Sequence, residues 1–251
     1  MADGKIIAVW GSPHSGKTLF ATKLATAIYD NYQSTVITLY TDLETPALPV
    51  VFPNDRESSV CSVGIPLSKA GMDDEDVIRN LLTVKNKQNF GFLGYKIGDT
   101  RFSYPKYGYS KAAELLRVLC HLADYVIVDC VSQPENSPLA STALELAQQV
   151  IRLASPDLSS LAWYGSQKSV YIDPKYRWDE QIQGLNVPNS DTSVPVDEIK
   201  AHLGEVAFTL PNSIAVRLQA QKGTLTESSS DKRFETRMRE IAREVVTYDR
   251  D

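Results

Sequence analysis

One eight-residue segment near the amino terminus limits the possible folds of this 251-residue chain more than any other feature. Residues 11–18 read GSPHSGKT and fit the pattern G-x-x-x-x-G-K-[ST]. The apolar run KIIAVW at residues 5–10 predicts a buried strand, and residues 18–29 place apolar side chains at helical spacing. A strand, a glycine loop and a helix in this order predict a phosphate-binding loop (the phosphate loop, residues 11–18).

The chemistry of phosphate binding explains why these residue types occur together. Such a loop turns its backbone N–H groups inward, and the helix amino terminus adds a partial positive charge. Gly16 lets the backbone approach the ligand, the Lys17 ammonium reaches the β- and γ-phosphates, and the Thr18 hydroxyl is a ligand for Mg2+. The expected phosphate contacts are Gly11, Ser12, Pro13, His14, Ser15, Gly16, Lys17, Thr18 and Leu19.

Two aspartates follow strand-like runs and are candidates for metal binding and catalysis. Asp129 ends the continuous apolar run YVIVD, and the carboxyl ends of parallel strands form the ligand-binding edge of a sheet. Asp129 is therefore a candidate to hold a water bound to Mg2+. Asp42 follows the β-branched run at residues 35–40, where it either orients an attacking water or contacts Mg2+, or simply forms a turn.

Short apolar runs alternate with helical patterns along the whole chain. This alternation predicts an α/β fold with a doubly wound, mainly parallel sheet, and we expect one domain over residues 1–251. Loops are expected at 173–180 and 188–194, and the polar segment 224–231 is expected to be mobile. The predicted strands are 5–10, 35–40, 90–97, 125–129, 149–154, 181–186 and 205–208; the predicted helices are 18–29, 74–84, 110–122 with Ser110 as N-cap, 139–147, 158–167, 195–203, 212–221 and 232–247.

Composition excludes several classes of protein. The formal net charge of -5 disfavours non-specific binding to DNA, which needs clustered lysine and arginine. The cysteines are three in number and widely spaced, so neither a disulfide framework nor a zinc site is expected. There is no apolar run of about 18 residues and no signal-peptide pattern, so we expect a cytoplasmic protein without a membrane span.

Two segments have a second interpretation. Residues 232–246 form a basic amphipathic pattern, which suits either a helix on a membrane surface or the last helix of the fold packed on the sheet. Residues 101–109, RFSYPKYGY, interleave aromatic and cationic side chains, which suits base stacking, a partner-binding loop or a packed loop. The packed helix and the partner-binding or packed loop are the preferred interpretations.

The phosphate loop and the two aspartates, in this order, resemble the MinD/ParA class of P-loop ATPases. Residues 154–161 (ASPDLSSL) are similar to that class's strand end with a proline and a serine-bearing helix. Residues 203–211 (LGEVAFTLP) and 212–225 are similar to its late strand and the stretch that follows. Within the class the chain looks most like the TadZ/CpaE branch, which helps to position pilus-assembly and secretion machinery.

This resemblance implies ATP and Mg2+ as ligands, slow hydrolysis and a nucleotide-dependent homodimer. It makes Lys17 and Thr18 contacts to phosphate and metal, Asp42 the acid that positions water, and Asp129 the Walker B acid. It matches Asn186 to an asparagine that reads adenine, and it places Pro211 and Asn212 where the base pocket is completed. It also implies protein partners in a pilus or secretion machine, which would recruit the chain to the inner face of the membrane.

One position departs from the class. Typical members have a second lysine directly after the first loop glycine, and this lysine reaches the nucleotide of the partner subunit. Ser12 stands there in this chain, so activation by a partner's lysine is not expected, and His14 is the candidate replacement. Members of the TadZ branch often have a receiver-like domain before the ATPase core, whereas here the first strand is expected from residue 5.

Two rival functions come from other classes. A small-molecule kinase would use the same loop, but it would also need an acceptor site and an arginine-rich lid, and no such lid is evident between the strands. A binding module that does not hydrolyse ATP would keep the nucleotide as a structural or switching ligand, and Ser12 favours this alternative.

Overall fold

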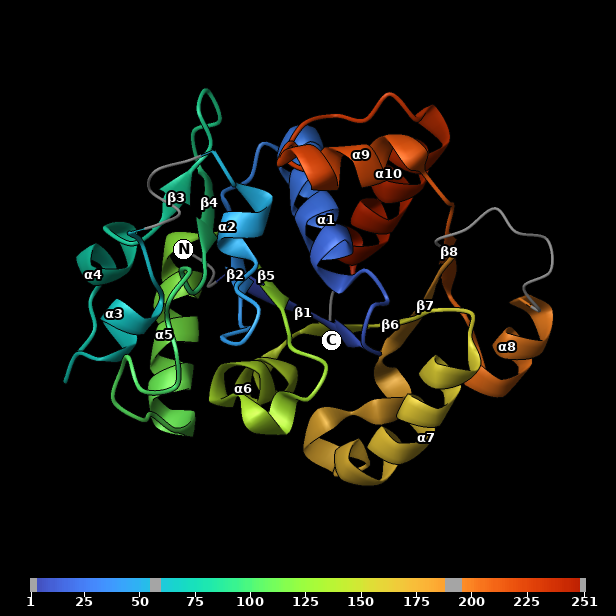
Figure 1. Ribbon diagram of the computed structural model, residues 1–251, viewed down its shortest axis with the longest axis horizontal. Coiled ribbons are helices and arrows are strands. Elements are labelled where there is room, and N and C mark those ends of the chain that lie inside the picture. Colours follow the sequence, from blue (N-terminus) through green and yellow to red (C-terminus); the bar gives the residue numbers. More distant parts are fainter. Residues whose placement is uncertain (1–3, 55–59, 188–195, 249–251) are drawn as a thin grey trace.

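The computed structural model describes residues 4–54, 60–187 and 196–248, and within them eight strands form one sheet (Figure 1). The strand order is β3-β4-β2-β5-β1-β6-β7-β8. Every neighbouring pair is parallel except β3 and β4, which are antiparallel. The strands are β1 (Lys5–Gly11), β2 (Val36–Tyr40), β3 (Leu82–Thr83), β4 (Phe90–Leu93), β5 (Tyr125–Asp129), β6 (Gln149–Ala154), β7 (Ile182–Asn186) and β8 (Phe208–Leu210).

Helices cover both faces of this sheet. In Figure 1, α1, α2, α9 and α10 lie on one face, and α5, α6 and α7 lie on the other. The predicted fold class, a doubly wound and mainly parallel α/β sheet, is therefore confirmed. The helices are α1 (Lys17–Tyr32), α2 (Leu48–Val51), α3 (Gly64–Leu67), α4 (Asp74–Ile78), α5 (Tyr109–Leu122), α6 (Pro138–Leu146), α7 (Leu158–Tyr171), α8 (Val196–Leu203), α9 (Ile214–Lys222) and α10 (Lys232–Thr247), with short 3-10 turns at 134–136, 174–176 and 178–180.

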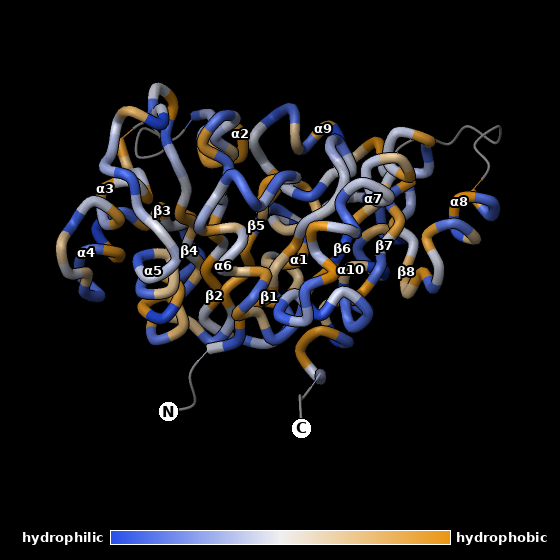
Figure 2. The backbone as a smooth tube through the Cα atoms, turned by 90° about the horizontal axis from the view of Figure 1, so that it is seen from below, coloured by the Kyte–Doolittle hydropathy of each residue, from blue (hydrophilic) through white to orange (hydrophobic). Residues whose placement is uncertain are grey.

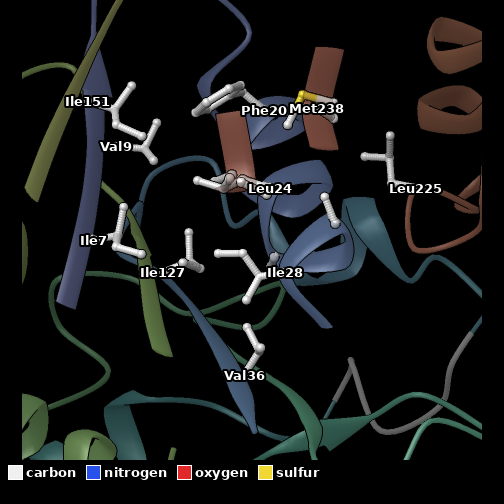
Figure 3. Packing of buried hydrophobic residues seen from close by; sticks show 14 of the residues in the cluster. Ile7, Val9, Phe20, Leu24, Ile28, Val36, Ile127, Ile151, Leu225 and Met238 are labelled. Carbon is white, nitrogen blue, oxygen red and sulfur yellow. The ribbon is translucent and has the colours of Figure 1, made fainter. Parts of the chain in front are cut away.

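Alternating side chains of β1 supply both halves of the core. Ile7 and Val9 pack with α1 and α10, as Figure 3 shows, whereas Ile6, Ala8 and Trp10 belong to the core on the opposite face, with α5, α6 and the end of α7. Because strands in the centre of the sheet are buried on both faces, they read as continuous apolar runs. Figure 2 shows these hydrophobic strands in the middle of the molecule.

The apolar face of α10 is buried against this core. Phe234, Met238, Ile241 and Val245 are each no more than 3% exposed. Of the two interpretations of residues 232–246, the structure therefore has the last helix of the fold packed on the sheet. Its apolar face is not exposed for binding to a membrane surface. Among the described residues, no helix combines the length and apolar character that crossing a membrane requires.

Several predicted elements are shifted or shortened. The helix predicted over 74–84 ends at Ile78, because Leu82 and Thr83 pair with β4 instead. The strand predicted over 205–208 lies at Phe208–Leu210, where its register places Asn186 opposite Leu210. The helix predicted from Ser110 begins at Tyr109, and Gly108 is its N-cap. Residues 173–180 contain two 3-10 turns, and the loop expected at 188–194 lies outside the described residues.

The polar segment 224–231 is packed rather than mobile. Leu225, Thr226 and Ser229 are buried, at 4%, 7% and 4% exposure. The Lys23 ammonium of α1 donates to the backbone carbonyl of Glu227 at 2.7 Å. It also lies 3.9 Å from a carboxylate oxygen of Glu235. The expectation of mobility was wrong because a buried lysine from α1 fixes this segment through its backbone.

This buried lysine should make stability depend on pH. Burial lowers the pKa of Lys23 from 10.5 to about 8, although Glu235 offsets part of the effect. Between these two values the unfolded chain binds more protons than the folded one, so the unfolding free energy rises with pH. We expect a contribution of about 2 kcal/mol between pH 8 and pH 10. In denaturant titrations, the unfolding free energy of wild type should rise by about this amount relative to that of Lys23→Met between pH 8 and pH 10. Lys168→Met, which removes an exposed lysine, is the control for the substitution itself.

All three tryptophans of the chain lie in one aromatic cluster below the phosphate loop. The Trp10 ring, at the end of β1, is 5.3 Å from Trp163 of α7 and 6.0 Å from Trp178, between ring centroids. Tyr171 packs on Trp10 at 4.7 Å, and the guanidinium of Arg152 lies 4.0 Å above Trp178. This cluster supports β1 and joins the loop that follows it to α7.

Candidate nucleotide site

The phosphate loop connects β1 to α1 at the carboxyl edge of the sheet, in the middle of the strand order (Figure 1). Its backbone needs glycine at both ends of the motif. Gly11 has φ 148°, and a Cβ there would clash with the carbonyl oxygen of Leu153. Gly16 has φ 82° directly before α1, where a Cβ would lie 2.5 Å from the Asn186 amide nitrogen. The two glycines therefore allow a close approach of the loop to Leu153 of β6 and to Asn186 at the end of β7.

Lys17 begins α1 and directs a desolvated ammonium into the loop. Its Nζ donates to the Ser12 carbonyl at 3.0 Å and to the Ser132 hydroxyl at 2.7 Å. Burial lowers the pKa of Lys17, and the nearby carboxylates of Asp129 and Asp42 offset part of that shift. Lys17 donates to neutral oxygens and to neither carboxylate, so its charge is available to an anionic ligand at the amino end of α1.

Thr18 and Asp129 form the other half of the site. The Thr18 hydroxyl donates to Asp129 Oδ2 at 2.6 Å. Asp129 is only 6% exposed, and its Oδ1 has no hydrogen-bond partner among the described residues. Burial raises the pKa of Asp129 to about 6, against the opposing effects of Thr18 and Lys17. A buried carboxylate with an unsatisfied oxygen fits a hydrated cation, because a nearby positive charge would stabilise its ionised form.

This donor set suits a metal bound jointly by protein and ligand. The described residues contain no cluster of three or more His, Cys, Asp or Glu side chains that could hold an ion alone. Mg2+ is commonly bound through one or two protein oxygens, substrate phosphates and water. A hydroxyl and a carboxylate beside an anion-binding loop therefore fit Mg2+ better than a metal held only by protein.

Asp42 lies at the same edge but also forms a turn. Its Oδ1 accepts hydrogen bonds from the backbone of Glu44 at 2.9 Å and of Thr45 at 2.8 Å. The same carboxylate is close enough to affect the pKa values of Lys17 and Asp129. Asp42 therefore forms the turn that one interpretation of the sequence predicted. Its position also suits the other interpretation, in which it acts on a water or Mg2+ near the phosphates.

Two hydroxyl residues at this edge were missed by sequence reasoning. Thr41 Oγ1 donates to the Asp129 carbonyl at 3.0 Å and accepts from the Val131 backbone at 3.1 Å, which ties the ends of β2 and β5 together. Ser132 contacts Lys17, as described above. Their only sequence signal is that they follow predicted strands by one and three residues.

The expected base-binding residues lie at the ends of β7 and β8. The Asn186 amide donates to the Ser15 carbonyl at 2.8 Å, so the structure brings Asn186 to the phosphate loop. Pro211 and Asn212 follow β8 and lie one strand farther out, and Asn212 Oδ1 is buried without a described hydrogen-bond partner. A groove beside Pro211 is lined by Thr209, Pro211, Lys232, Arg233, Thr236, Arg237 and Glu240.

Ser12 is directed into the protein. It is 1% exposed, and its hydroxyl lies 2.7 Å from that of Ser160 in α7. The Ser160 hydroxyl also accepts from the Ser155 backbone at 3.2 Å. Pro13 and His14 form the exposed tip of the loop, and His14 has φ 60°. At the position where typical MinD/ParA members have a second lysine, the Ser12 side chain therefore contacts α7 instead of pointing toward solvent.

Replacing Ser12 with lysine should destabilise the protein rather than restore a charge at the surface. The position has no room for four methylenes and an ammonium, and the Ser160 hydroxyl would lose its partner. We expect Ser12→Lys to lower the unfolding free energy by about 1–3 kcal/mol in a denaturant titration. The control His14→Lys changes an exposed residue of the same loop and should shift stability by less than about 0.5 kcal/mol. Equal stability of the two variants would contradict the burial argument.

Comparisons with known proteins agree with this geometry. No protein-family model matches the chain. A curated ParA family protein from Mycoplasma pneumoniae is 28% identical over 164 residues, which is 59% of this chain and 59% of that protein. A ParA family ATPase from Chlorobium tepidum superposes with a TM-score of 0.79 at 14% identity, covering 95% of this chain and 98% of its own. The septum site-determining protein MinD from Pyrococcus horikoshii, solved with Mg-ADP, gives 0.74 at 16% identity, covering 97% and 96%.

These likenesses establish the fold. The chain has the P-loop NTPase fold of the MinD and ParA ATPases, with the phosphate loop, the end of β2 and the end of β5 meeting at one edge. The match to the curated relative spans less than two thirds of either protein.

Proposed function

We propose that this chain binds ATP with Mg2+, hydrolyses it slowly, and uses its nucleotide state to control association with a second copy. One observation carries the proposal: a desolvated Lys17 lies beside the Thr18–Asp129 pair, whose carboxylate has an unsatisfied oxygen. This arrangement provides a cation for phosphate and oxygen ligands for a metal within one turn of a helix amino terminus. The similar fold of a MinD protein solved with Mg-ADP supports the same ligand class.

Thr18, Asp129 and Asp42 are the residues proposed to hold Mg2+. The Thr18 hydroxyl donates its proton to Asp129 and keeps lone pairs for an ion. Asp129 Oδ1 would accept a hydrogen bond from a water of that ion. When bound, Mg2+ would neutralise charge on the β- and γ-phosphates.

For hydrolysis, Asp42 is the proposed residue that orients the attacking water. Its carboxylate is fixed by the backbone of Glu44 and Thr45, so its orientation does not depend on a flexible rotamer. Lys17 would stabilise the charge that develops on the phosphate oxygens during in-line attack. Ser12 brings no second positive charge to the phosphates, which supports a slow rate.

The base is proposed to lie over the ends of β7 and β8. Asn186 contacts the phosphate loop through its amide, and Pro211 lies beside the groove next to α10. Asn212 supplies a buried acceptor without a partner in the described residues, which suits an exocyclic amino group such as that of adenine. This placement supports ATP over nucleotides that present an acceptor at the same point.

The finer assignment belongs to the same proposal. The serine at position 12 and the resemblances of residues 154–161 and 203–225 support the TadZ/CpaE branch, with protein partners in pilus assembly or secretion and recruitment to a membrane through those partners. One sheet with both faces covered supports treating residues 1–251 as one domain. The net charge of -5 continues to disfavour DNA as a partner.

Calorimetry and phosphate release test this proposal together. We expect wild type to bind Mg-ATP and Mg-ADP and to release phosphate without an acceptor. Binding without phosphate release would favour the non-hydrolysing module, for which the buried Ser12 is the supporting observation. Phosphate transfer that requires an added small molecule would favour a kinase. Absence of binding to either nucleotide would contradict the proposal itself.

The ATPase rate per molecule should be nearly independent of protein concentration. Ser12 is buried against α7 and cannot reach the phosphates of another subunit. A dimer must then use surfaces that flank the nucleotide, such as the first turn of α7, where Leu158 is 79% exposed. Light scattering should detect the Mg-ATP dimer while specific activity stays constant over a concentration series. A steep rise would show that a residue completes the site from the partner, and His14→Ala would be the first variant to compare.

A further inference from the structure

The connection between β5 and α6, residues 130–137, reaches the phosphate loop through one side chain. The Ser132 hydroxyl accepts a hydrogen bond from Lys17 Nζ at 2.7 Å. The other acceptor of Lys17 is the Ser12 carbonyl, at 3.0 Å, which belongs to the loop itself. Within the described part of the chain, Ser132 is thus the side chain from another element that holds the Lys17 ammonium.

A nucleotide would compete directly for this ammonium. Lysine has three N–H donors, and contact with both the β- and γ-phosphates would use two of them. The remaining donor cannot satisfy both the Ser12 carbonyl and the Ser132 hydroxyl. The Ser12 carbonyl is fixed in the loop backbone, whereas Ser132 is half-buried on a connecting segment, so the Ser132 bond is the one to be released.

We propose that Ser132 is a positioning residue that competes with nucleotide phosphate for Lys17 and thereby sets nucleotide affinity. The inference rests on the proposed nucleotide-binding function. It assigns Ser132 to the free state of the site: the hydroxyl holds the lysine when no phosphate is present and loses it when phosphate arrives.

Hydrogen bonds connect the segment around Ser132 to two other parts of the molecule. On one side of Ser132, the Val131 backbone donates to the Thr41 hydroxyl at 3.1 Å, beside Asp42. On the other side, the Tyr171 hydroxyl donates to the Glu135 carboxylate at 2.6 Å, and Tyr171 is the last residue of α7. The segment that loses its contact with Lys17 is therefore linked both to the loop after β2 and to α7.

This competition predicts the sign of a mutational effect. Removing the hydroxyl takes a partner from Lys17 in the free protein but not in the nucleotide complex, so binding should become tighter. The loss of one such hydrogen bond corresponds to about 2- to 10-fold in affinity. A serine that instead bound the phosphates would give the opposite sign, because its removal would weaken binding.

The test is a calorimetric titration of wild type, Ser132→Ala and Ser132→Thr with Mg-ATP and with Mg-ADP. We expect Ser132→Ala to bind Mg-ATP about 2- to 10-fold more tightly and Mg-ADP, which has no γ-phosphate and leaves a donor for Ser132, within about 2-fold of wild type. Ser132→Thr, which keeps a hydroxyl, should match wild type within about 2-fold for both nucleotides. Thermal unfolding distinguishes a positioning role from a general loss of stability. Without nucleotide, the melting temperature of Ser132→Ala should be lower than that of wild type. At saturating Mg-ATP the two melting temperatures should be equal. In a Lys17→Ala background, Ser132→Ala should no longer lower the melting temperature of the free protein.

The possible failures are distinguishable. If wild type binds Mg-ATP but Ser132→Ala binds it equally or more weakly, the competition is wrong while the proposed function stands. If the melting loss persists in the Lys17→Ala background, Ser132 acts through another contact and the inference is also wrong. If neither wild type nor variant binds Mg-ATP or Mg-ADP, the proposed function fails, and the inference fails with it.

Discussion

Replacing Lys17 with alanine should weaken Mg-ATP binding by about 2–4 kcal/mol, or about 30- to 1000-fold. The ammonium is largely desolvated already, and its present partners are neutral oxygens of Ser12 and Ser132. Binding would therefore add charged phosphate oxygens as partners of the ammonium in place of the neutral Ser132 hydroxyl, and hydrogen bonds to charged acceptors are stronger. Truncation removes this gain and leaves the phosphate charge without its nearest cation.

Isothermal titration calorimetry with Mg-ATP measures the effect directly. The matched control is His14→Ala, which keeps the backbone N–H of the loop, removes only an exposed side chain at its tip, and should keep the affinity within about 3-fold. Thermal unfolding of the free variants confirms that both are folded at the titration temperature. An affinity for Lys17→Ala equal to that of wild type would remove the phosphate loop from the nucleotide site.

Replacing Asp129 with asparagine should stabilise the free protein and abolish the contribution of Mg2+ to nucleotide affinity. The folded-state pKa of this carboxylate is raised from 3.8 to about 6, so its ionised form is disfavoured by folding. The cost is absent below pH 4, appears as pH rises from about 4 to 6, and is complete at pH 7. A shift of this size corresponds to about 3 kcal/mol, which a neutral asparagine would not incur.

The same substitution should weaken Mg-ATP binding by about 10- to 100-fold and leave binding of ATP in EDTA nearly unchanged. Thr18→Val provides the matched comparison: it also removes a metal contact, but it takes away the hydroxyl that donates to Asp129 and so should not stabilise the free protein. Denaturant titrations at pH 7 and pH 5 and calorimetry with and without Mg2+ measure both effects. Equal losses of affinity with and without the metal would overturn the metal assignment.

Much of the architecture follows from patterns that are local in sequence. β5 and β6 lie exactly where continuous apolar runs predict them, and α10 has its predicted bounds. These elements are predictable because a strand buried on both faces, or a long amphipathic helix, encodes its environment in its own residues. The phosphate loop is predictable for the same reason, since its glycines and its lysine act through adjacent residues.

The elements that were misplaced depend on partners far away in sequence. β3 consists of two residues and exists because it pairs with β4, and β8 is fixed by its register with β7. Local propensity favours a helix through residues 74–84, but the sheet edge overrides it in the second half of that stretch. No residue pattern within 82–83 predicts the pairing with β4.

The same distinction applies to the site. Lys17, Thr18 and Asp129 could be predicted from their motif and strand, and the structure brings them together. The contacts of Ser12 with Ser160 and of Lys17 with Ser132 join residues more than 100 positions apart. A serine carries little sequence information about its partner, so these contacts required the fold.

The aromatic cluster under the phosphate loop gives the protein an intrinsic optical reporter. The ring centroids of Trp163 and Trp178 both lie within 6.0 Å of the Trp10 centroid. The fluorescence of all three tryptophans therefore comes from one place in the molecule rather than from scattered surface positions. Trp10 directly precedes the loop, and Trp163 belongs to the helix that holds Ser12. The fluorescence spectrum of the unlabelled protein therefore records the state of the loop and of α7 together, without a dye and without an added tryptophan.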